Sequence, residues 1–194
     1  MWRRAERRGE WGVRVLGIDP GSRRTGWGVV EERRGDLRGL ASGVAAPGIG
    51  DLGIRLGAIA VQLEALLDEW NPDAVALERA FVGLNAASAL RLGEVRGVVL
   101  ASAGRRALPV VDYPPATVKV AVAGSGAAGK DMIARGVNAL LGLAVEPGDA
   151  SDALAVAICH LRHSSFASRL RSSDGTVPAT RRTRFRGRFL TAQR

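Results

Sequence analysis

Residues 15–30 read VLGIDPGSRRTGWGVV, and this stretch decides how the chain begins to fold. The apolar residues before Asp19 suit a strand interior, whereas a carboxylate there costs free energy unless a positive or hydrogen-bonding group meets it. The segment PGSRRTG that follows favours a turn. We therefore expect a hairpin with strands over 13–19 and 25–31, and with a carboxylate at the end of its first strand.

The rest of the chain alternates strands and helices. Apolar spacing and turn residues predict strands over 37–44, 74–77 and 108–111, and helices over 51–70, 85–102, 117–122, 131–141 and 149–163. A three-strand meander followed by strand and helix units predicts an α/β fold, with a mixed central sheet flanked by helices. The length suits one such domain, which we place at 11–165.

The formal net charge of +9 is concentrated at the two ends of the chain. Residues 1–10 carry four arginines against two glutamates, and residues 162–194 carry nine arginines against one aspartate. We expect a basic extension over 1–10 and an arginine-rich, disordered tail over 166–194. Basic arms on a near-neutral body suggest a polyanionic partner such as nucleic acid, although they can also be solvated extensions.

The sequence gives no sign of a membrane protein. No stretch approaches the roughly 18 uninterrupted apolar residues that a membrane span requires, and the arginine-rich start lacks a following apolar signal region. A lone Cys159 cannot form an intramolecular disulfide, which suits a reducing compartment. We therefore expect a cytoplasmic protein without membrane contact.

Four carboxylates are the candidate chemical groups. Asp19 and Glu78 each end a predicted strand, and Asp149 and Asp152 are three residues apart on one helix face. Crowded carboxylates repel each other unless cations neutralise them, and oxygen-only ligands favour Mg²⁺ or Mn²⁺. Two such ions can activate a water and stabilise the leaving oxygen of a phosphodiester. The acids therefore predict a metal-dependent nuclease.

Each acid also has a purely structural interpretation. Asp149 and Asp152 could complete a helix cap, Asp19 could be a turn residue, and Glu78 could pair with Arg79 in solvent. A shared site is the stronger hypothesis, because these separate roles would all have to fall where an α/β sheet presents its site.

Four segments of the chain form a recognisable pattern within residues 13–165: GIDPGSRRTGWGVV, ALERAFVGLNAASALRLGEVRG, YPPATVK and DASDALAVAICH. Together they resemble the RuvC family of Holliday junction resolvases. The resemblance implies an RNase H-like fold and a homodimer that nicks four-way DNA at symmetric positions in recombination and DNA repair. It also implies 5′-phosphate and 3′-hydroxyl ends, and a preference for a short TT-containing sequence.

The same resemblance assigns residues and partners. The catalytic and metal-binding acids would be Asp19, Glu78, Asp149 and Asp152, with two ions of Mg²⁺ or Mn²⁺ per subunit. The family's partners are junction DNA and the branch-migration proteins RuvA and RuvB. The DNA-binding positions would be Arg79, Phe81, Asn85, Lys119 and Lys130.

Some of these positions have alternative roles. Phe81 could stack on an unpaired base or pack on the start of the next helix. Lys119 and Lys130 could bind phosphate or be solvated surface residues. Leu84 stands where family members often have lysine, which removes a potential phosphate contact. Separately from the DNA contacts, Gly93 and Gly97 are four apart, a spacing that permits close helix approach at a dimer interface.

Three competing functions can be named. Actin and Hsp70 type ATPases begin with a similar hairpin, but they enclose the nucleotide between two related domains and this chain has length for one. An RNA-cleaving relative is the closer alternative. A noncatalytic junction-binding module is the third, and acids at all four positions count against it.

Overall fold

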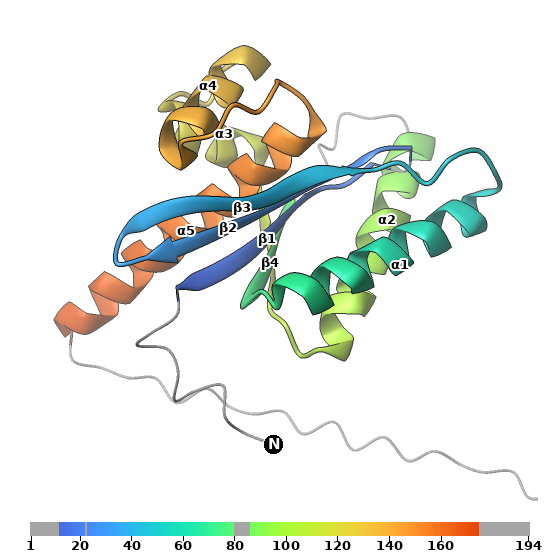
Figure 1. Cartoon of the computed structure of the whole chain (residues 1–194), viewed down its shortest axis with the longest axis horizontal. Coiled ribbons are helices and arrows are strands. Elements are labelled where there is room, and N and C mark those ends of the chain that lie inside the picture. The colour runs from blue at the N-terminus through green and yellow to red at the C-terminus, as the bar shows by residue number, and fades with distance from the viewer. Residues whose placement is uncertain (1–11, 22, 80–85, 175–194) are drawn as a thin grey trace, which may run out of the picture.

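The computed structural model describes residues 12–21, 23–79 and 86–174. Within them lies a sheet in the order β3-β2-β1-β4-β5 (Figure 1). Its strands are β1 (Val13–Asp19), β2 (Thr25–Arg33), β3 (Asp36–Ala45), β4 (Ala74–Glu78) and β5 (Val110–Tyr113). β1, β2 and β3 form an antiparallel meander, whereas β4 runs parallel to β1 and β5 parallel to β4. The mixed sheet predicted from the sequence is confirmed.

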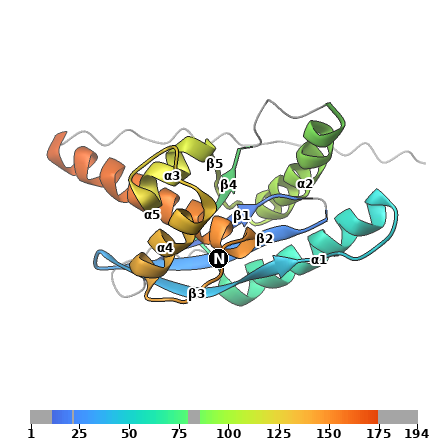
Figure 2. The same ribbon diagram turned by 90° about the horizontal axis from the view of Figure 1, so that it is seen from above.

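Helices cover both faces of the sheet (Figure 2). They are α1 (Leu52–Trp70), α2 (Ala86–Arg105), α3 (Pro115–Ala123), α4 (Lys130–Leu141) and α5 (Asp149–Asp174). α1 and α2 bury one apolar cluster against the sheet, with Leu16 and Ile18 of β1 among its members. α3, α4 and α5 bury the other cluster, to which Val15 of β1 belongs. The alternation of side chains along β1 thus serves two cores.

α5 lies directly on the central strand. A Cβ atom on Gly17 would be 2.0 Å from the carbonyl oxygen of Ala153 and 2.8 Å from the amide nitrogen of Ala157. Only glycine permits so close an approach of strand and helix backbones. This contact fixes where α5 crosses the sheet.

Two elements differ from the sequence-based expectation. β5 begins at Val110 rather than at 108, because Pro109 has no N–H to donate to a strand ladder, although its carbonyl accepts a bond from Val75 N at 2.9 Å. α5 continues to Asp174, so residues 166–174 are helical rather than part of the tail expected from residue 166. The sequence contains no glycine or proline between Asp149 and Asp174, so nothing in it stops the helix.

Across the described ranges, none of the helices combines the length and the apolar character that crossing a membrane would need.

Candidate active site

Asp19 and Glu78 lie side by side at the carboxyl ends of two parallel strands. β1 and β4 pair through Ile18 and Leu77, the residues just before the two acids. Ile18 and Leu77 point into the core beneath α1 and α2. Because side chains alternate along a strand, Asp19 and Glu78 project from the opposite face, on which α5 lies.

The first turn of α5 brings the other two acids to this edge. Asp149 and Asp152 both lie in that turn. Gly26, which pairs with Asp19 across the hairpin, is so close to the helix that a Cβ there would be 2.0 Å from the Asp149 carbonyl oxygen. The structure thus brings together all four acids that the sequence singles out.

The charges of these acids act on one another. Burial raises the pKa of Asp19 to about 7, and the carboxylates of Glu78, Asp152 and Asp149 contribute to the rise in that order. The pKa of Glu78 is also raised, by burial and then by Asp152, and a hydrogen bond with Asp19 partly opposes the rise. Burial raises the pKa of Asp152 as well. Burial and mutual repulsion therefore disfavour the ionised forms of Asp19, Glu78 and Asp152 unless a proton or a cation is added to the site.

Capping of α5 does not require either aspartate. The hydroxyl of Ser151 accepts a hydrogen bond from the amide of Gly148 at 3.0 Å and donates one to the carbonyl of Gly148 at 2.8 Å. Ser151 is almost completely buried. The serine therefore organises the helix start, which leaves the carboxylates of Asp149 and Asp152 available to the site.

One contact of the site was not anticipated from the sequence. Arg24, in the turn between β1 and β2, donates from Nε to Asp149 Oδ2 at 2.6 Å. The only local signal for this ion pair is the presence of two adjacent arginines, Arg23 and Arg24, after Asp19. Nothing in their spacing indicates which of them reaches a residue far along the chain.

Both lysines lie near the acids. Lys119 is half-buried on α3, and Lys130 is exposed as the first residue of α4. The positive charges of both lysines lower the pKa of Glu78 and of Asp152, and Lys130 also lowers that of Asp19. The two lysines therefore offset part of the negative charge of the acids, although no ion pair joins them to these carboxylates among the described residues.

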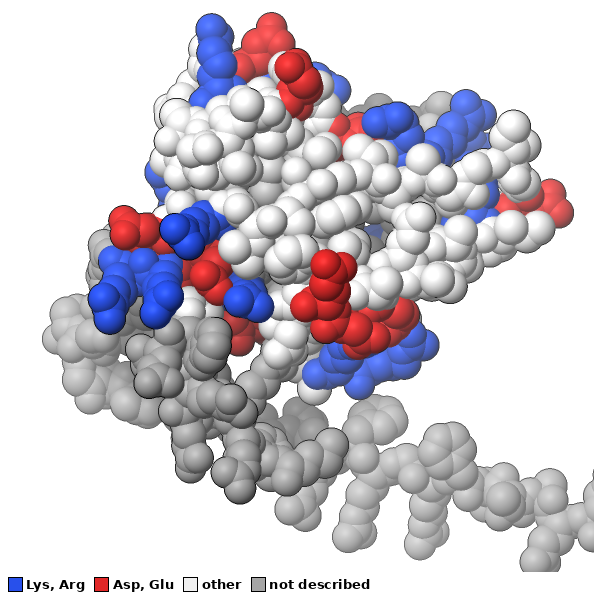
Figure 3. Space-filling view, in the orientation of Figure 1, with Lys and Arg blue, Asp and Glu red and all other residues white. Residues whose placement is uncertain are grey.

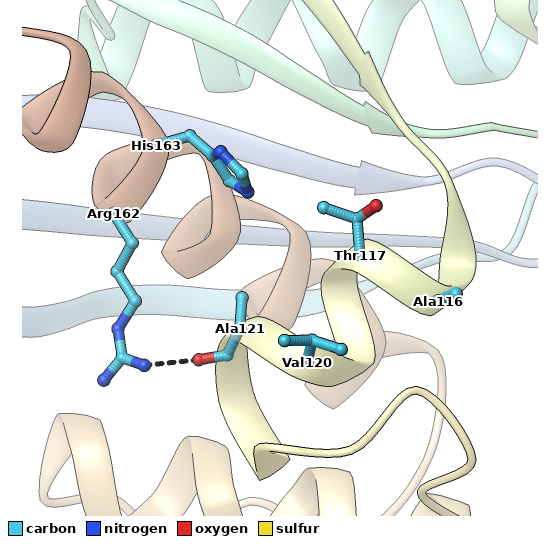
Figure 4. Close-up of a pocket in the computed structure, with 6 residues that line it drawn as sticks. All are labelled: Ala116, Thr117, Val120, Ala121, Arg162 and His163. Atoms are coloured by element: carbon cyan, nitrogen blue, oxygen red, sulfur yellow. Dashed lines mark hydrogen bonds between the residues drawn. The ribbon is translucent and has the colours of Figure 1, made fainter.

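A hydrogen bond between α5 and α3 holds in place the helix that carries Lys119. The guanidinium of Arg162 on α5 donates a hydrogen bond to the carbonyl oxygen of Ala121 on α3 (Figure 4). The two residues lie at an open cavity of about 480 Å³, lined by Ala116, Thr117, Val120, Ala121, Arg162 and His163. None of the four acids lines this cavity, so it is not part of the acidic site.

The remaining predicted DNA-contact positions follow β4. Arg79 is exposed, and its amide donates to the Tyr113 carbonyl at 2.8 Å, so β5 fixes the point at which the chain leaves the sheet. Phe81, Leu84 and Asn85 lie outside the described residues.

The chemistry of the acids fits a hard divalent cation. All four donors are carboxylates, and their burial and mutual repulsion favour an added positive charge. As the side chains now stand, however, no three His, Cys, Asp or Glu residues in the described ranges are arranged to hold a metal ion. In this arrangement one oxygen of Asp149, Oδ2, accepts the hydrogen bond from Arg24.

The outer surface distributes its charges unevenly. On the face shown in Figure 3, charged side chains gather at the margins, where acidic and basic groups lie next to one another. A broad uncharged region lies between them. On this face the described residues present no continuous basic surface.

Acids from β1, β4 and the first turn of α5, gathered at one edge of a mixed sheet, define an RNase H-like nuclease. A model of the family described as "Crossover junction endodeoxyribonuclease RuvC" matches residues 15–160. The chain belongs to the RuvC family of crossover junction endodeoxyribonucleases. The fold and the enzyme class expected from the sequence are both confirmed.

Individual relatives agree with this assignment. The crossover junction endodeoxyribonuclease RuvC of Anaeromyxobacter sp. (strain K) is 48% identical over 153 residues, which span 79% of this chain and 83% of that protein. The Thermus thermophilus RuvC structure has a TM-score of 0.73 at 35% identity and covers 80% of this chain and 97% of its own. T. thermophilus RuvC in complex with Holliday junction substrate has a TM-score of 0.76 at 33% identity, with the same coverage.

Proposed function

We propose that this chain resolves Holliday junctions in recombination and DNA repair by hydrolysing one phosphodiester in each of two strands at symmetric positions. The observation that carries the proposal is the convergence of Asp19, Glu78, Asp149 and Asp152 at the carboxyl edge of the sheet. The T. thermophilus relative in complex with Holliday junction substrate supports a four-way DNA as the substrate.

The four acids would hold two divalent cations, Mg²⁺ or Mn²⁺, in each subunit. Bound there, such ions supply Lewis-acid activation of a water and neutralise the charge that develops on the leaving 3′ oxygen. Asp19 would be the central ligand, since the other three acids all act on its pKa. Because the 3′ oxygen is the leaving group, cleavage would leave a 5′-phosphate and a 3′-hydroxyl.

The cationic side chains would hold the scissile strand. Lys119 and Lys130 lie close enough to the acids to lower their pKa values, so a phosphate that approached the acids would also meet these two positive charges. Arg79, exposed directly after Glu78, would contact the backbone beside them. We assign Phe81 and Asn85 to the junction centre, and the TT preference to this loop, on the family resemblance.

Symmetric incision requires two copies of the site at a fixed separation, which a twofold dimer supplies. Leu90, Gly93, Gly97 and Leu100 recur along one side of α2 at spacings of three and four residues. Leu90 is 66% and Leu100 37% exposed, and a Cβ on either glycine would meet nothing within 4 Å. This uncovered apolar stripe, in which two leucines flank two glycines, supports α2 as the homodimer interface.

Partners and compartment follow the family. We propose RuvA and RuvB as the branch-migration partners of the reaction. We also propose the cytoplasm as its compartment, because the buried free thiol of Cys159 suits reducing conditions.

The proposed function is tested by incubating the full chain with a synthetic four-way junction, a linear duplex and an RNA/DNA hybrid, each with Mg²⁺ or Mn²⁺. Paired nicks confined to the junction are expected. Asp19→Asn should abolish cleavage while junction binding in metal-free buffer is retained. Cleavage of the hybrid in preference to the junction would instead identify an RNA-cleaving enzyme.

Asp36→Asn is the matched control for the loss of one carboxylate. Asp36 is exposed at the turn between β2 and β3, where it pairs in strand register with Arg33. Asp19 pairs in register with Gly26 at the other end of β2. This variant should cleave as the unmodified chain does. If both variants lost activity equally, general charge rather than the acidic site would be responsible.

A further inference from the structure

The fourth acid of the site already has a cationic partner. Arg24 Nε and Asp149 Oδ2 are 2.6 Å apart, a charged hydrogen bond at the short end of the usual range. The Arg24 side chain is 64% exposed and that of Asp149 is 29% exposed. One partner is therefore anchored in the protein, and the other can move into solvent.

The backbone on both sides of this pair is fixed. Thr25 is buried and its hydroxyl donates to the carbonyl of Gly21 at 2.6 Å, which closes the turn that carries Arg24. Gly26 then packs against the backbone of Asp149. Only the arginine side chain has to move for the pair to open, so no rearrangement of the fold is needed.

The pair competes with the function of the carboxylate. A cation bound between Asp149 and the other acids would need an oxygen of Asp149, and Arg24 already bonds Oδ2. The positive charge of Arg24 beside the site would also repel that cation. The side-chain relative exposures, 64% for Arg24 and 29% for Asp149, leave the charge of Arg24 close to the acids and partly screened by solvent. Arg24 thus supplies, in the metal-free chain, part of the positive charge that the acids require.

We propose that Arg24 is a positioning residue that holds Asp149 in the metal-free chain and must release it when a divalent cation binds. This inference rests on the proposed metal-dependent function and adds to it a residue that sets the affinity for the ion. Binding of the cation then exchanges one counter-ion of Asp149 for another.

The test is calorimetric titration of the full chain with Mn²⁺, without DNA, at about 0.15 M salt, where charges that are not in contact are largely screened. Arg24→Ala should bind Mn²⁺ about two- to fivefold more tightly than the unmodified chain, which corresponds to loss of a partly exposed ion pair. Arg24→Gln, which keeps a hydrogen-bonding group but no charge, should behave like Arg24→Ala. Arg24→Lys should lie between Arg24→Ala and the unmodified chain.

Arg23→Ala is the control, because it removes the same charge from an exposed residue of the same turn. It should leave the affinity for Mn²⁺ nearly unchanged, and circular dichroism should show every variant folded. Equal affinity of Arg24→Ala and the unmodified chain, or weaker binding by Arg24→Ala, would overturn the inference and leave the proposed function intact. Absence of Mn²⁺ binding by the unmodified chain would overturn the proposed metal site, and the inference with it.

Discussion

The hydroxyl of Tyr113 lies 3.0 Å from Nδ1 of His160, in a hydrogen bond that joins β5 to α5. Tyr113 is paired in register with Glu78 on the neighbouring strand. His160 lies on the helix whose first turn carries Asp149 and Asp152. This bond therefore ties the strand beside one acid to the helix that bears two others.

His160 should make the fold sensitive to mild acid. Burial, and then the charge of His163, lower its pKa below 6.5, so the folded chain keeps His160 neutral where the unfolded chain protonates it. Stability should therefore fall as the pH drops below 6.5 and the unfolded state takes up the proton. His160→Gln should lose less stability than the unmodified chain between pH 7 and pH 5 in urea titrations. An unchanged slope would contradict the neutral, buried state of His160.

The Tyr113→Phe variant separates this titration from the hydrogen bond itself. Loss of the hydroxyl leaves Nδ1 of His160 without this partner and should cost about 1 kcal/mol of unfolding free energy at pH 8. The acid sensitivity should remain, because His160 is still half-buried.

Asp19→Asn should stabilise the metal-free protein at alkaline pH. The folded pKa of Asp19 is about 7 against an ordinary 3.8, so the folded state binds more protons than the unfolded state between these values. The unmodified chain loses stability as the pH rises through this window. The unfolding free energy of Asp19→Asn should therefore exceed that of the unmodified chain by about 1–3 kcal/mol at pH 8 and by much less at pH 4.5.

Thermal denaturation checks this prediction in two buffers. Mg²⁺ should raise the Tm of the unmodified chain and of the Asp36→Asn control, but should raise that of Asp19→Asn far less, because a ligand that binds only the folded state stabilises it. Equal Tm shifts for all three proteins would argue against binding at the acids.

Gly17→Ala should damage the fold, whereas Gly57→Ala should not. A methyl group at Gly17 would lie 2.0 Å from the Ala153 carbonyl oxygen, and this overpacking should cost about 1–3 kcal/mol or more. Gly57 is exposed within α1, where a Cβ would meet nothing within 4 Å. Alanine at this position should therefore raise the free energy of unfolding by about 0.5–1 kcal/mol. Urea denaturation of both variants measures the difference. Similar stabilities would mean that α5 does not lie against β1 as described.

Gly97→Gln should weaken the proposed dimer without unfolding the subunit. The added side chain meets open space within one chain, but it would enter the apolar stripe on α2. The dissociation constant of the dimer should rise at least about tenfold, in line with the 1–3 kcal/mol typical of overpacking. Light scattering during size-exclusion chromatography measures it, with Gly57→Gln on α1 as the control. A dimer unaffected by Gly97→Gln would place the interface elsewhere.

The sequence was sufficient for the sheet and the positions of the acids, because both follow from local pattern. Apolar alternation indicates β1 and β2, and a carboxylate that directly follows such a run must lie at a strand end. The approach of Asp149 to Gly26 depends on packing between segments far apart in the chain, so it could only be expected from resemblance. The ion pair of Arg24 depends on the turn conformation and on that packing together, and no local pattern encodes it.

The two adjacent residues that end β1 lie on opposite faces of the sheet. Ile18 is buried beneath α1 and α2, and Asp19 lies near the other acids beside α5. A single inserted or deleted residue within β1 would exchange their places and put an aliphatic group in the site and a carboxylate in the core. β1 is also paired on both sides, by β2 and β4, so a slipped strand would break two ladders at once. The length of β1 is therefore fixed, and insertions should be tolerated only in the loops outside it.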